Sequence, residues 1–134
     1  MKVRRIRDEE TGQTATEFAI VLPLFCVLLF AVIQFGIVFN NYVTLTDAVR
    51  AGARKAIVSR TAVNPPATAE AAVRAAADNL KQSDLVVTVT APAWQQGADV
   101  TVRATYPYDI NLLGWVVASG NLESKMVERL EAGG

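Results

Sequence analysis

The residues of this chain that could do chemistry are few, and their spacing matches no catalytic or metal-binding pattern. The chain has no histidine, which removes the commonest general base near neutral pH and the commonest metal ligand. Its one cysteine, Cys26, lies in an apolar run, where a space-filling thiol is favoured over a cross-link between two chains. The acidic residues do not follow calcium-loop spacing, and a glycine-rich phosphate loop is missing. The sequence therefore predicts no enzyme activity, no metal and no cofactor.

Charge and length narrow the class of protein further. The chain of 134 residues has 13 basic and 13 acidic residues, so its formal net charge is +0 and it has no general attraction for nucleic acid. The length allows one modest domain in addition to a membrane segment. The positive mean hydropathy of +0.26 comes mostly from one apolar run and from many alanines.

That apolar run predicts a membrane-spanning helix. Residues 19–39 are almost entirely apolar, and no charged residue occurs between Glu17 and Asp47. The hydrocarbon core of a bilayer requires a helix of roughly 20 mainly apolar residues, which this run supplies. The alternative is a buried core helix, but a small domain has no core that could bury such a helix on every side. We therefore assign residues 13–46 to a transmembrane and assembly helix.

Three residues inside this helix are candidates for contacts with partner helices. Pro23 removes a backbone hydrogen bond, so the helix should kink or loosen there. Gln34 is polar at membrane depth and could donate a hydrogen bond to another helix. Gly36, expected on nearly the same face, would allow close approach. Both Gln34 and Gly36 could also be incidental.

The charges on the two sides of the run do not by themselves decide its orientation. A basic cluster precedes the run, and an equal number of basic residues follows it: Lys2, Arg4, Arg5 and Arg7 before, Arg50, Arg54, Lys55 and Arg60 after. A short basic leader before an apolar run is the arrangement of export signals, so we expect a cytoplasmic N-terminus. The run is too long for an ordinary secretory signal, and no small-residue cleavage site follows it.

The residues ahead of the run resemble the leader of type IV prepilins. In that family a membrane peptidase cuts after a glycine, and a glutamate occupies the fifth mature position. The resemblance implies a cut between Gly12 and Gln13, which makes Glu17 the fifth residue and places Phe18 after it. The mature chain would start with Gln13, whereas many major pilins start with phenylalanine or methionine. This departure bears on whether the new N-terminus is methylated.

Glu17 is a carboxylate at the edge of a hydrocarbon segment. Burial without a partner would be costly, so it should pair, remain among the headgroups or take up a proton. The pilin resemblance implies that the new amine at Gln13 of a neighbouring subunit pairs with Glu17 during lateral packing. The simpler interpretation is that Glu17 marks the membrane boundary.

A wider set of motifs resembles TadE-like proteins, which are minor pilins or pseudopilins of tight-adherence (Tad/Flp) pilus systems. These motifs are Gln13 to Phe18, Leu22-Pro23-Leu24, Gln34-Phe35-Gly36, Asn41-Tyr42 and residues 48–54. The resemblance implies a structural role in pilus assembly. It also implies as partners the lipid bilayer, other pilins or pseudopilins, a prepilin peptidase and the pilus assembly platform.

The remainder of the chain predicts a small α+β domain. Apolar residues at three- and four-residue spacing, from Val38 through Leu45 to Ala56, extend the first helix beyond the membrane. Asn64-Pro65-Pro66 should end it and start a second helix, because proline is accepted in a first helical turn, and this helix continues through the alanine-rich residues 67–80. Alternation then predicts antiparallel strands over residues 85–90 and 100–106, the latter ended by Pro107, and a weaker third strand over 121–129.

The apolar segment 110–117 has three possible roles. It could cap the core, touch the membrane interface or contact another subunit, and core capping is favoured. The C-terminal tail, residues 132–134, should fray.

The predicted fold class is thus α+β and pilin-like: a long transmembrane helix, a second short helix and a small three-stranded antiparallel sheet. The expected organisation is a cytoplasmic leader (1–12), the transmembrane helix (13–46) and an extracytoplasmic domain (47–134). We expect a single-pass protein of the bacterial inner membrane that stays there or enters a surface pilus. The alternative function is an uncleaved, anchored scaffold or sensor that binds partners without polymerising.

Overall fold

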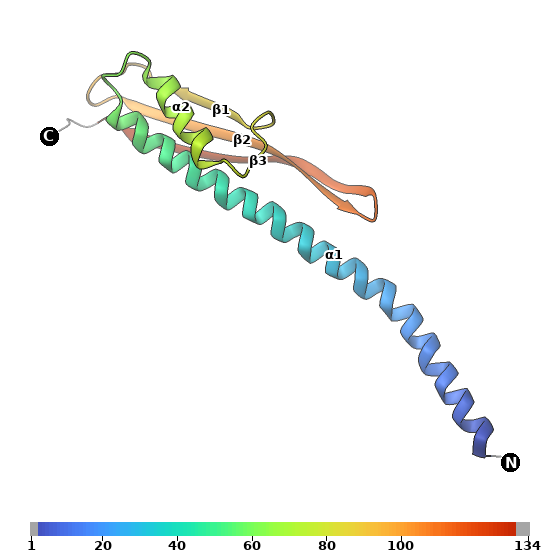
Figure 1. Cartoon of the computed structure of the whole chain (residues 1–134). Coiled ribbons are helices and arrows are strands. Elements are labelled where there is room, and N and C mark those ends of the chain that lie inside the picture. The colour runs from blue at the N-terminus through green and yellow to red at the C-terminus, as the bar shows by residue number, and fades with distance from the viewer. Residues whose placement is uncertain (1–2, 131–134) are drawn as a thin grey trace.

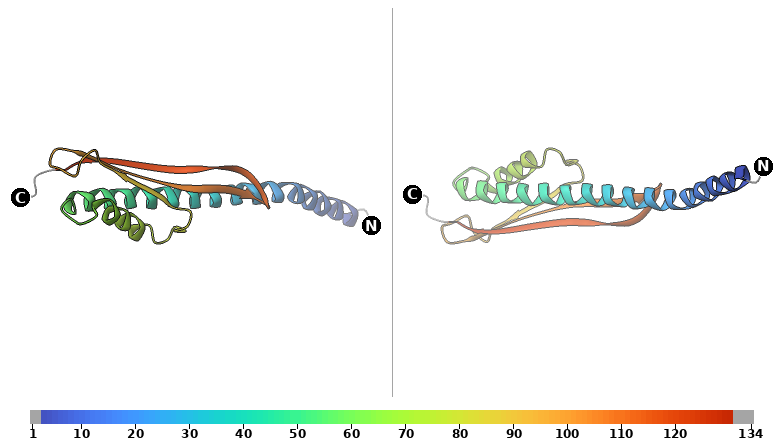
Figure 2. Two further views of the ribbon diagram at one scale, coloured as in Figure 1. Left: turned by 90° about the horizontal axis from the view of Figure 1, so that it is seen from above. Right: turned by 90° about the horizontal axis from the view of Figure 1, so that it is seen from below.

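One helix of 56 residues, α1 (Val3–Val58), runs the length of the molecule (Figure 1). The structure is a computed structural model that describes residues 3–130, with side chains from Gly12 onward. Lys2 and the tail predicted to fray lie outside the described residues. At about 1.5 Å per residue, α1 is about 84 Å long, which is far more than a small domain can cover. Its C-terminal part packs on the rest of the chain, and its N-terminal part extends away from it (Figures 1 and 2).

Pro23 lies inside α1 without ending it. The helix is continuous, and its N-terminal half curves away from the axis of the C-terminal half (Figures 1 and 2). A proline inside a helix removes one backbone hydrogen bond and is a common cause of bending. The expected loosening therefore takes the form of a curve in this part of the helix.

The second helix, α2 (Pro65–Ala76), begins where the sequence predicts it and ends earlier. Asn64 is its N-cap and accepts a hydrogen bond from the backbone N–H of Ala67 at 3.3 Å through Oδ1. At the other end, the side-chain amide of Gln82 donates to the carbonyl oxygens of Ala77 (2.7 Å) and Leu80 (3.2 Å). These bonds satisfy carbonyls that a longer helix would have satisfied, so the chain turns away after Ala76.

The N-cap of α2 yields a first prediction. Replacing Asn64 with alanine should lower the free energy of unfolding by about 1 kcal/mol, because one N-terminal N–H loses its acceptor. Urea unfolding in detergent, followed by the fluorescence of the partly buried Trp94, measures this change. Asn64→Asp keeps an acceptor and is the matched control. Equal stability of the alanine and aspartate variants would show that the cap contributes nothing.

The sheet is antiparallel with strand order β1-β2-β3, and two of its strands are much longer than predicted. β1 (Val86–Thr90) pairs only with the first half of β2 (Asp99–Leu112), and β3 (Trp115–Arg129) pairs with β2 along its whole length. The prediction that Pro107 ends the second strand is wrong. Pro107 lies beyond the end of β1, where β2 is an edge strand, and edge strands tolerate proline.

A two-residue turn joins β2 and β3. Leu112 pairs with Trp115, and the two residues between them have positive φ, 52° at Leu113 and 91° at Gly114. Positive φ at both central positions defines a type I′ turn, which asparagine followed by glycine usually occupies. Leucine in this left-handed region costs roughly 1–2 kcal/mol.

The prediction that segment 110–117 caps the core is wrong. The segment instead forms the outer end of the β2–β3 hairpin, where Leu113 is 73% and Trp115 81% exposed. The hairpin carries the segment beyond the second helix and the first strand, out of reach of the core (Figure 1).

The core lies between the C-terminal half of α1, α2 and the sheet. Its buried residues share small or branched apolar side chains: Leu45, Ala48, Val49, Ala53, Ala56, Ala69, Val73, Ala77, Leu80, Leu85, Val100, Val102, Ala104 and Leu130. We call residues 45–130 the sheet domain. The small residues let the two helices approach closely, most of all at Gly52. A Cβ added there would overlap Val73 Cγ2 and lie 3.2 Å from the carbonyl oxygen of Ala69.

Candidate functional site

The N-terminal half of α1 is an apolar surface that the rest of the chain leaves uncovered. Its most apolar stretch has a mean hydropathy of 2.7 and is 0% buried. Large apolar side chains remain exposed on every side of it, from Phe18 (64% exposed) to Phe39 (58%). The first fully buried side chain of α1 is that of Leu45, within the sheet domain. The alternative of a buried core helix is therefore wrong for this segment, whose length and composition allow it to cross a membrane.

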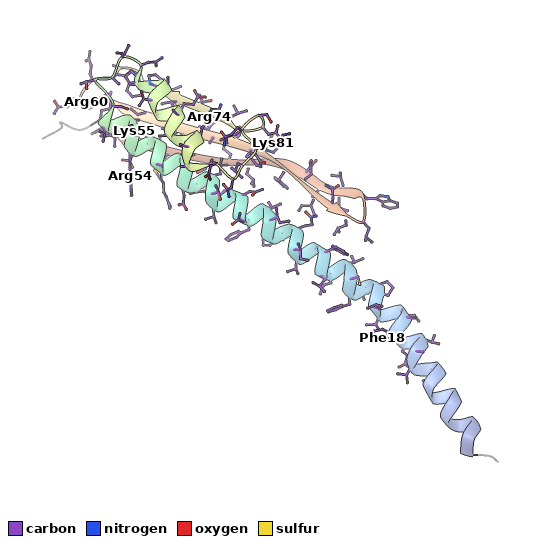
Figure 3. All side chains as sticks on the ribbon, in the orientation of Figure 1. Phe18, Arg54, Lys55, Arg60, Arg74 and Lys81 are labelled. Atoms are coloured by element: carbon purple, nitrogen blue, oxygen red, sulfur yellow. The ribbon has the colours of Figure 1, made fainter. Side chains whose placement is uncertain are left out.

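The residues that open this segment lie within two turns of α1. The side-chain amide of Gln13 donates a hydrogen bond to Glu17 Oε1 at 3.1 Å, and Thr16 Oγ1 donates to the carbonyl oxygen of Gly12 at 2.9 Å. Phe18 projects from the helix without a covering element (Figure 3). The bond between Gly12 and Gln13 lies inside the helix, which begins at Val3.

Glu17 is exposed, and its hydrogen-bond partner is the neutral side-chain amide of Gln13. Among the described side chains, no cation pairs with it. An amide can orient a carboxylate but cannot balance its charge in a medium of low dielectric. The geometry leaves the negative charge of Glu17 available to a positive group from outside the chain.

The structure corrects the expected placement of Gln34 and Gly36 on one face. Residues two positions apart in an α-helix are separated by about 200° around its axis, so Gln34 and Gly36 point to nearly opposite sides. Gln34 is partly covered, whereas Gly36 is exposed and an added Cβ there would meet nothing within 4 Å. Pro23 is also exposed. The structure therefore brings Gly12, Gln13 and Glu17 together and leaves Pro23, Gln34 and Gly36 as separate positions along the helix.

Gln34 belongs to a stripe that the sequence analysis did not identify. Partly covered residues recur at three- and four-residue spacing along α1, at Ala31, Gln34, Val38 and Asn41, and lead into the buried Leu45. Strands β2 and β3 both contact α1, and their hairpin extends along it toward this stripe (Figures 1 and 2). The sequence signal for this stripe was the three- and four-residue spacing from Ala31 to the core, because residues at that spacing lie on one face of a helix.

The hairpin end is the second feature that sequence reasoning missed. Four of its apolar side chains are mostly exposed: Leu113, Trp115, Val116 and Val117. Its signals were the absence of charge between Asp109 and Glu123 and the Leu-Gly pair at the turn. We call residues 112–117 the hairpin tip.

The charges of the sheet domain form exposed pairs. Arg50 and Asp47 are 3.3 Å apart on α1, Arg103 of β2 and Glu123 of β3 3.3 Å, and Lys81 and Asp84 3.0 Å. Such exposed pairs contribute little to stability. Hydrogen bonds from Lys81 and then Ser83 hold the pKa of the Asp84 carboxyl below its ordinary value.

Basic side chains gather at the end of α1 farthest from the apolar half. Arg54, Lys55 and Arg60 all lie there (Figure 3). Among the described residues, no group of three or more histidine, cysteine, aspartate or glutamate side chains could hold a metal ion. The two exposed surfaces described above, the N-terminal half of α1 and the hairpin tip, are apolar and suited to packing.

The fold and the exposed apolar helix together fit a single-pass membrane protein with a small α+β domain at one end of its helix. Residues 12–54 match the model of a protein family described as TadE-like protein. The match confirms the TadE-like resemblance over this third of the chain, and that family is structural rather than enzymatic. It begins at Gly12, covers the whole apolar half of α1 and ends just after Gly52 in the sheet domain. No curated protein and no solved structure matches the chain.

Proposed function

We propose that this chain is a TadE-like minor pilin or pseudopilin that is cut after Gly12 and acts structurally in the assembly of a tight-adherence pilus. The observation that carries the proposal is the uncovered apolar half of α1, which starts at Glu17-Phe18 with Gly12 one turn before it. An apolar helix exposed on all sides is stable only in lipid or against other apolar helices. A pilus subunit uses both surroundings in succession.

The proposed assembly contact follows from the charges at the start of α1. A cut after Gly12 gives Gln13 a positive amine, and Glu17 has a carboxylate with which no cation pairs among the side chains that the structure describes. In lateral packing, the amine of one subunit lies against Glu17 of the next, so both charges enter the apolar interior as a pair. Pro23 and Gly36 then serve helix packing, Pro23 by bending the helix and Gly36 by close approach.

The expected topology and partners follow from this role. The N-terminus faces the cytoplasm of a bacterial cell, the helix crosses the inner membrane, and the sheet domain lies outside. The partners are the bilayer, other pilins or pseudopilins, a prepilin peptidase and the pilus assembly platform. The chain is the substrate of the peptidase and has no catalytic activity of its own.

Intact-mass measurement of membrane-extracted protein, from hosts with and without the peptidase, tests the proposal. We expect loss of residues 1–12 only where the peptidase is present, and retention of these residues in a Gly12→Val variant. Gly36→Ala is the matched control, because it changes an exposed glycine of the same helix and leaves the cut site intact. A wild-type chain that keeps residues 1–12 in the host with the peptidase would contradict processing.

One observation favours the second candidate, an uncleaved anchored scaffold or sensor. α1 is continuous from Val3 through the bond between Gly12 and Gln13, so a peptidase must unwind the helix to reach that bond. Retention of residues 1–12 together with unchanged partner binding would favour this candidate over a processed pilin.

A further inference from the structure

The hairpin tip is apolar although its turn favours a polar residue. Leu113 has a φ of 52°, in the left-handed region that asparagine or aspartate adopts more readily. Trp115 is 81% exposed and Leu113 73%, and no charged residue occurs between Asp109 and Glu123. A polar side chain would suit both the turn and water better, so the residues present point to a partner that covers the tip.

The tip lies level with the middle of the apolar run of α1. Val102 of β2 packs at the level of Gly52, since a Cβ on Gly52 would lie 3.5 Å from Val102 Cγ1. From Val102 to Leu112 the strand extends about 34 Å at about 3.4 Å per residue. About 22 residues of α-helix span the same length, which leads from Gly52 back to about residue 30. The hairpin accordingly ends beside the light-blue part of α1 (Figures 1 and 2).

Lipid cannot be the partner that covers the tip at this level. Asp109 lies three residues before Leu112, and beyond Thr105 β2 has no neighbour other than β3 among the described strands, so the ribbon has unpaired edges. A carboxylate and unpaired N–H and C=O groups are too costly in contact with the hydrocarbon centre. The position of the hairpin therefore suits a subunit whose apolar helix is surrounded by other helices and water, as in an assembled fibre.

A groove of matching chemistry lies on α1 at the same level, and we call it the α1 groove. It has a volume of about 190 Å³, and its lining is entirely apolar: Cys26, Leu29, Phe30 and Ile33. An apolar cavity of about 150 Å³ is large enough to hold a benzene ring. The α1 groove therefore has room for one aromatic side chain.

The α1 groove opens to the side of the helix, out of line with the chain's own hairpin. At about 100° per residue, the centre of the groove lies about 110° around the helix axis from the partly covered stripe that runs from Ala31 to Asn41. Glu17 lies about 170° from the groove, on nearly the opposite side of α1. Each copy therefore has Glu17 on one side and the groove on the other, which suits a head-to-tail contact that repeats from copy to copy.

From these positions we infer that the hairpin tip of one copy docks in the α1 groove of a second copy, with the Trp115 ring against Cys26 and Phe30. The inference rests on the proposed function in assembly. The proposed pairing of Glu17 with the Gln13 amine of the next copy displaces that copy toward its sheet domain by four residues, about 6 Å. The tip, level with about residue 30 of its own helix, is then level with about residue 26 of the next helix. Both contacts therefore join the same two copies.

The single cysteine of the chain provides the experiment, because Cys26 lines the α1 groove. A tagged Leu113→Cys/Cys26→Ser chain is produced together with the untagged wild-type chain in cells that assemble the pilus, and bis-maleimidoethane joins neighbouring thiols. Only a contact between the tip of the tagged chain and Cys26 of the wild-type chain gives a heterodimer. We expect about tenfold more heterodimer than from a tagged Val63→Cys/Cys26→Ser chain. Val63 is the control because it is fully exposed, in the loop between α1 and α2.

Intact mass and pilus output, measured on the same cells, separate this inference from the proposed function. Normal loss of residues 1–12 and normal pilus output, with no heterodimer above the Val63 control, would overturn the docking alone. A cross-link from the tip only to a different pilin would also overturn it, because a second copy is the stated occupant. A wild-type chain that is neither cut nor assembled would overturn the proposed function and, with it, this inference.

The ring of Trp115 is tested in the same tagged chain. Adding Trp115→Ala should lower the heterodimer yield about tenfold, because a buried aromatic anchor contributes much of the affinity of an interface. Trp115→Phe keeps an aromatic ring and should retain most of the heterodimer. Equal yields from these two variants would show that no ring enters the groove and would overturn the docking.

Glu17 tests whether both contacts join the same two copies. Adding Glu17→Ala to the tagged chain should remove the heterodimer, since the tip reaches the groove of the copy whose amine pairs with this carboxylate. A heterodimer that persists in the Glu17→Ala chain would show that the two copies align without this pair, which would overturn the proposed alignment of tip and groove.

Discussion

Replacing Gly52 with alanine should lower the free energy of unfolding of the sheet domain by about 1–3 kcal/mol. The added Cβ would overlap Val73 Cγ2 and lie 3.2 Å from the carbonyl oxygen of Ala69. Neither neighbour can yield easily, since Val73 is fully buried and Ala69 O belongs to the backbone of α2. Helix propensity alone would favour alanine by about 1 kcal/mol, so a net loss can come only from the close contact.

Urea unfolding in detergent, followed by Trp94 fluorescence, measures the loss. Gly52→Val should be more damaging, because its two further methyl groups must enter the same closed space. The double variant Gly52→Ala/Val73→Ala is the control. Because it removes the overlapping methyl group, its loss of stability should be smaller than the sum of the losses in the two single variants. A Gly52→Ala chain as stable as the wild type would show that α1 and α2 can separate at little cost.

Replacing Glu17 with alanine should abolish assembly while leaving membrane insertion intact. In the proposed contact, Glu17 balances the amine of a neighbouring subunit, and removal of one partner of a buried pair costs about 3–5 kcal/mol. That cost corresponds to a loss of at least about a hundredfold in subunit affinity. Insertion depends on the apolar residues that follow, and these are unchanged.

Pilus output and co-purification of partner pilins measure assembly, and carbonate extraction measures insertion. Thr16→Val is the matched control, because it alters the adjacent residue and its bond to the Gly12 carbonyl without changing charge. Glu17→Gln keeps the shape of the side chain and separates the charge from the hydrogen bond to Gln13. Unchanged pilus output and unchanged co-purification of partner pilins in Glu17→Ala would contradict the proposed pairing of Glu17.

These two predictions test different parts of the molecule. Glu17 and Gly52 are 35 residues apart on one helix, which corresponds to about 52 Å. Changes at sites so far apart act additively on stability. Loss of assembly in a Glu17 variant with a normally folded sheet domain can therefore be assigned to the N-terminal end of α1.

Local composition was sufficient to predict the parts of the fold that neighbouring residues determine. The membrane helix follows from the absence of charge between Glu17 and Asp47, because hydrocarbon excludes charges wherever the rest of the chain lies. The start of α2 follows from Asn64-Pro65-Pro66, whose cap and prolines act within one helical turn. The strand near residues 85–90 follows from a period of two.

Strand length was not predictable in the same way. A strand continues as long as a partner supplies hydrogen bonds, and β3 supplies them to β2 well beyond Pro107. The proline is a local stop signal, but its cost depends on whether its missing N–H faces a neighbour or an open edge. The position of β1 decides this, because its first residue, Val86, pairs with Thr105 and β1 does not reach Pro107.

The sequence by itself therefore determined the membrane helix, the α+β class and the candidate residues Gly12, Gln13 and Glu17, because each depends on residue type and spacing along one helix. Only the tertiary structure decided the position of the hairpin tip and the need for a glycine at position 52. Both depend on segments far apart in the chain. Trp115 is exposed at the end of a long hairpin because β2 and β3 pair to their ends, and Gly52 has no room for a side chain because α2 packs against it.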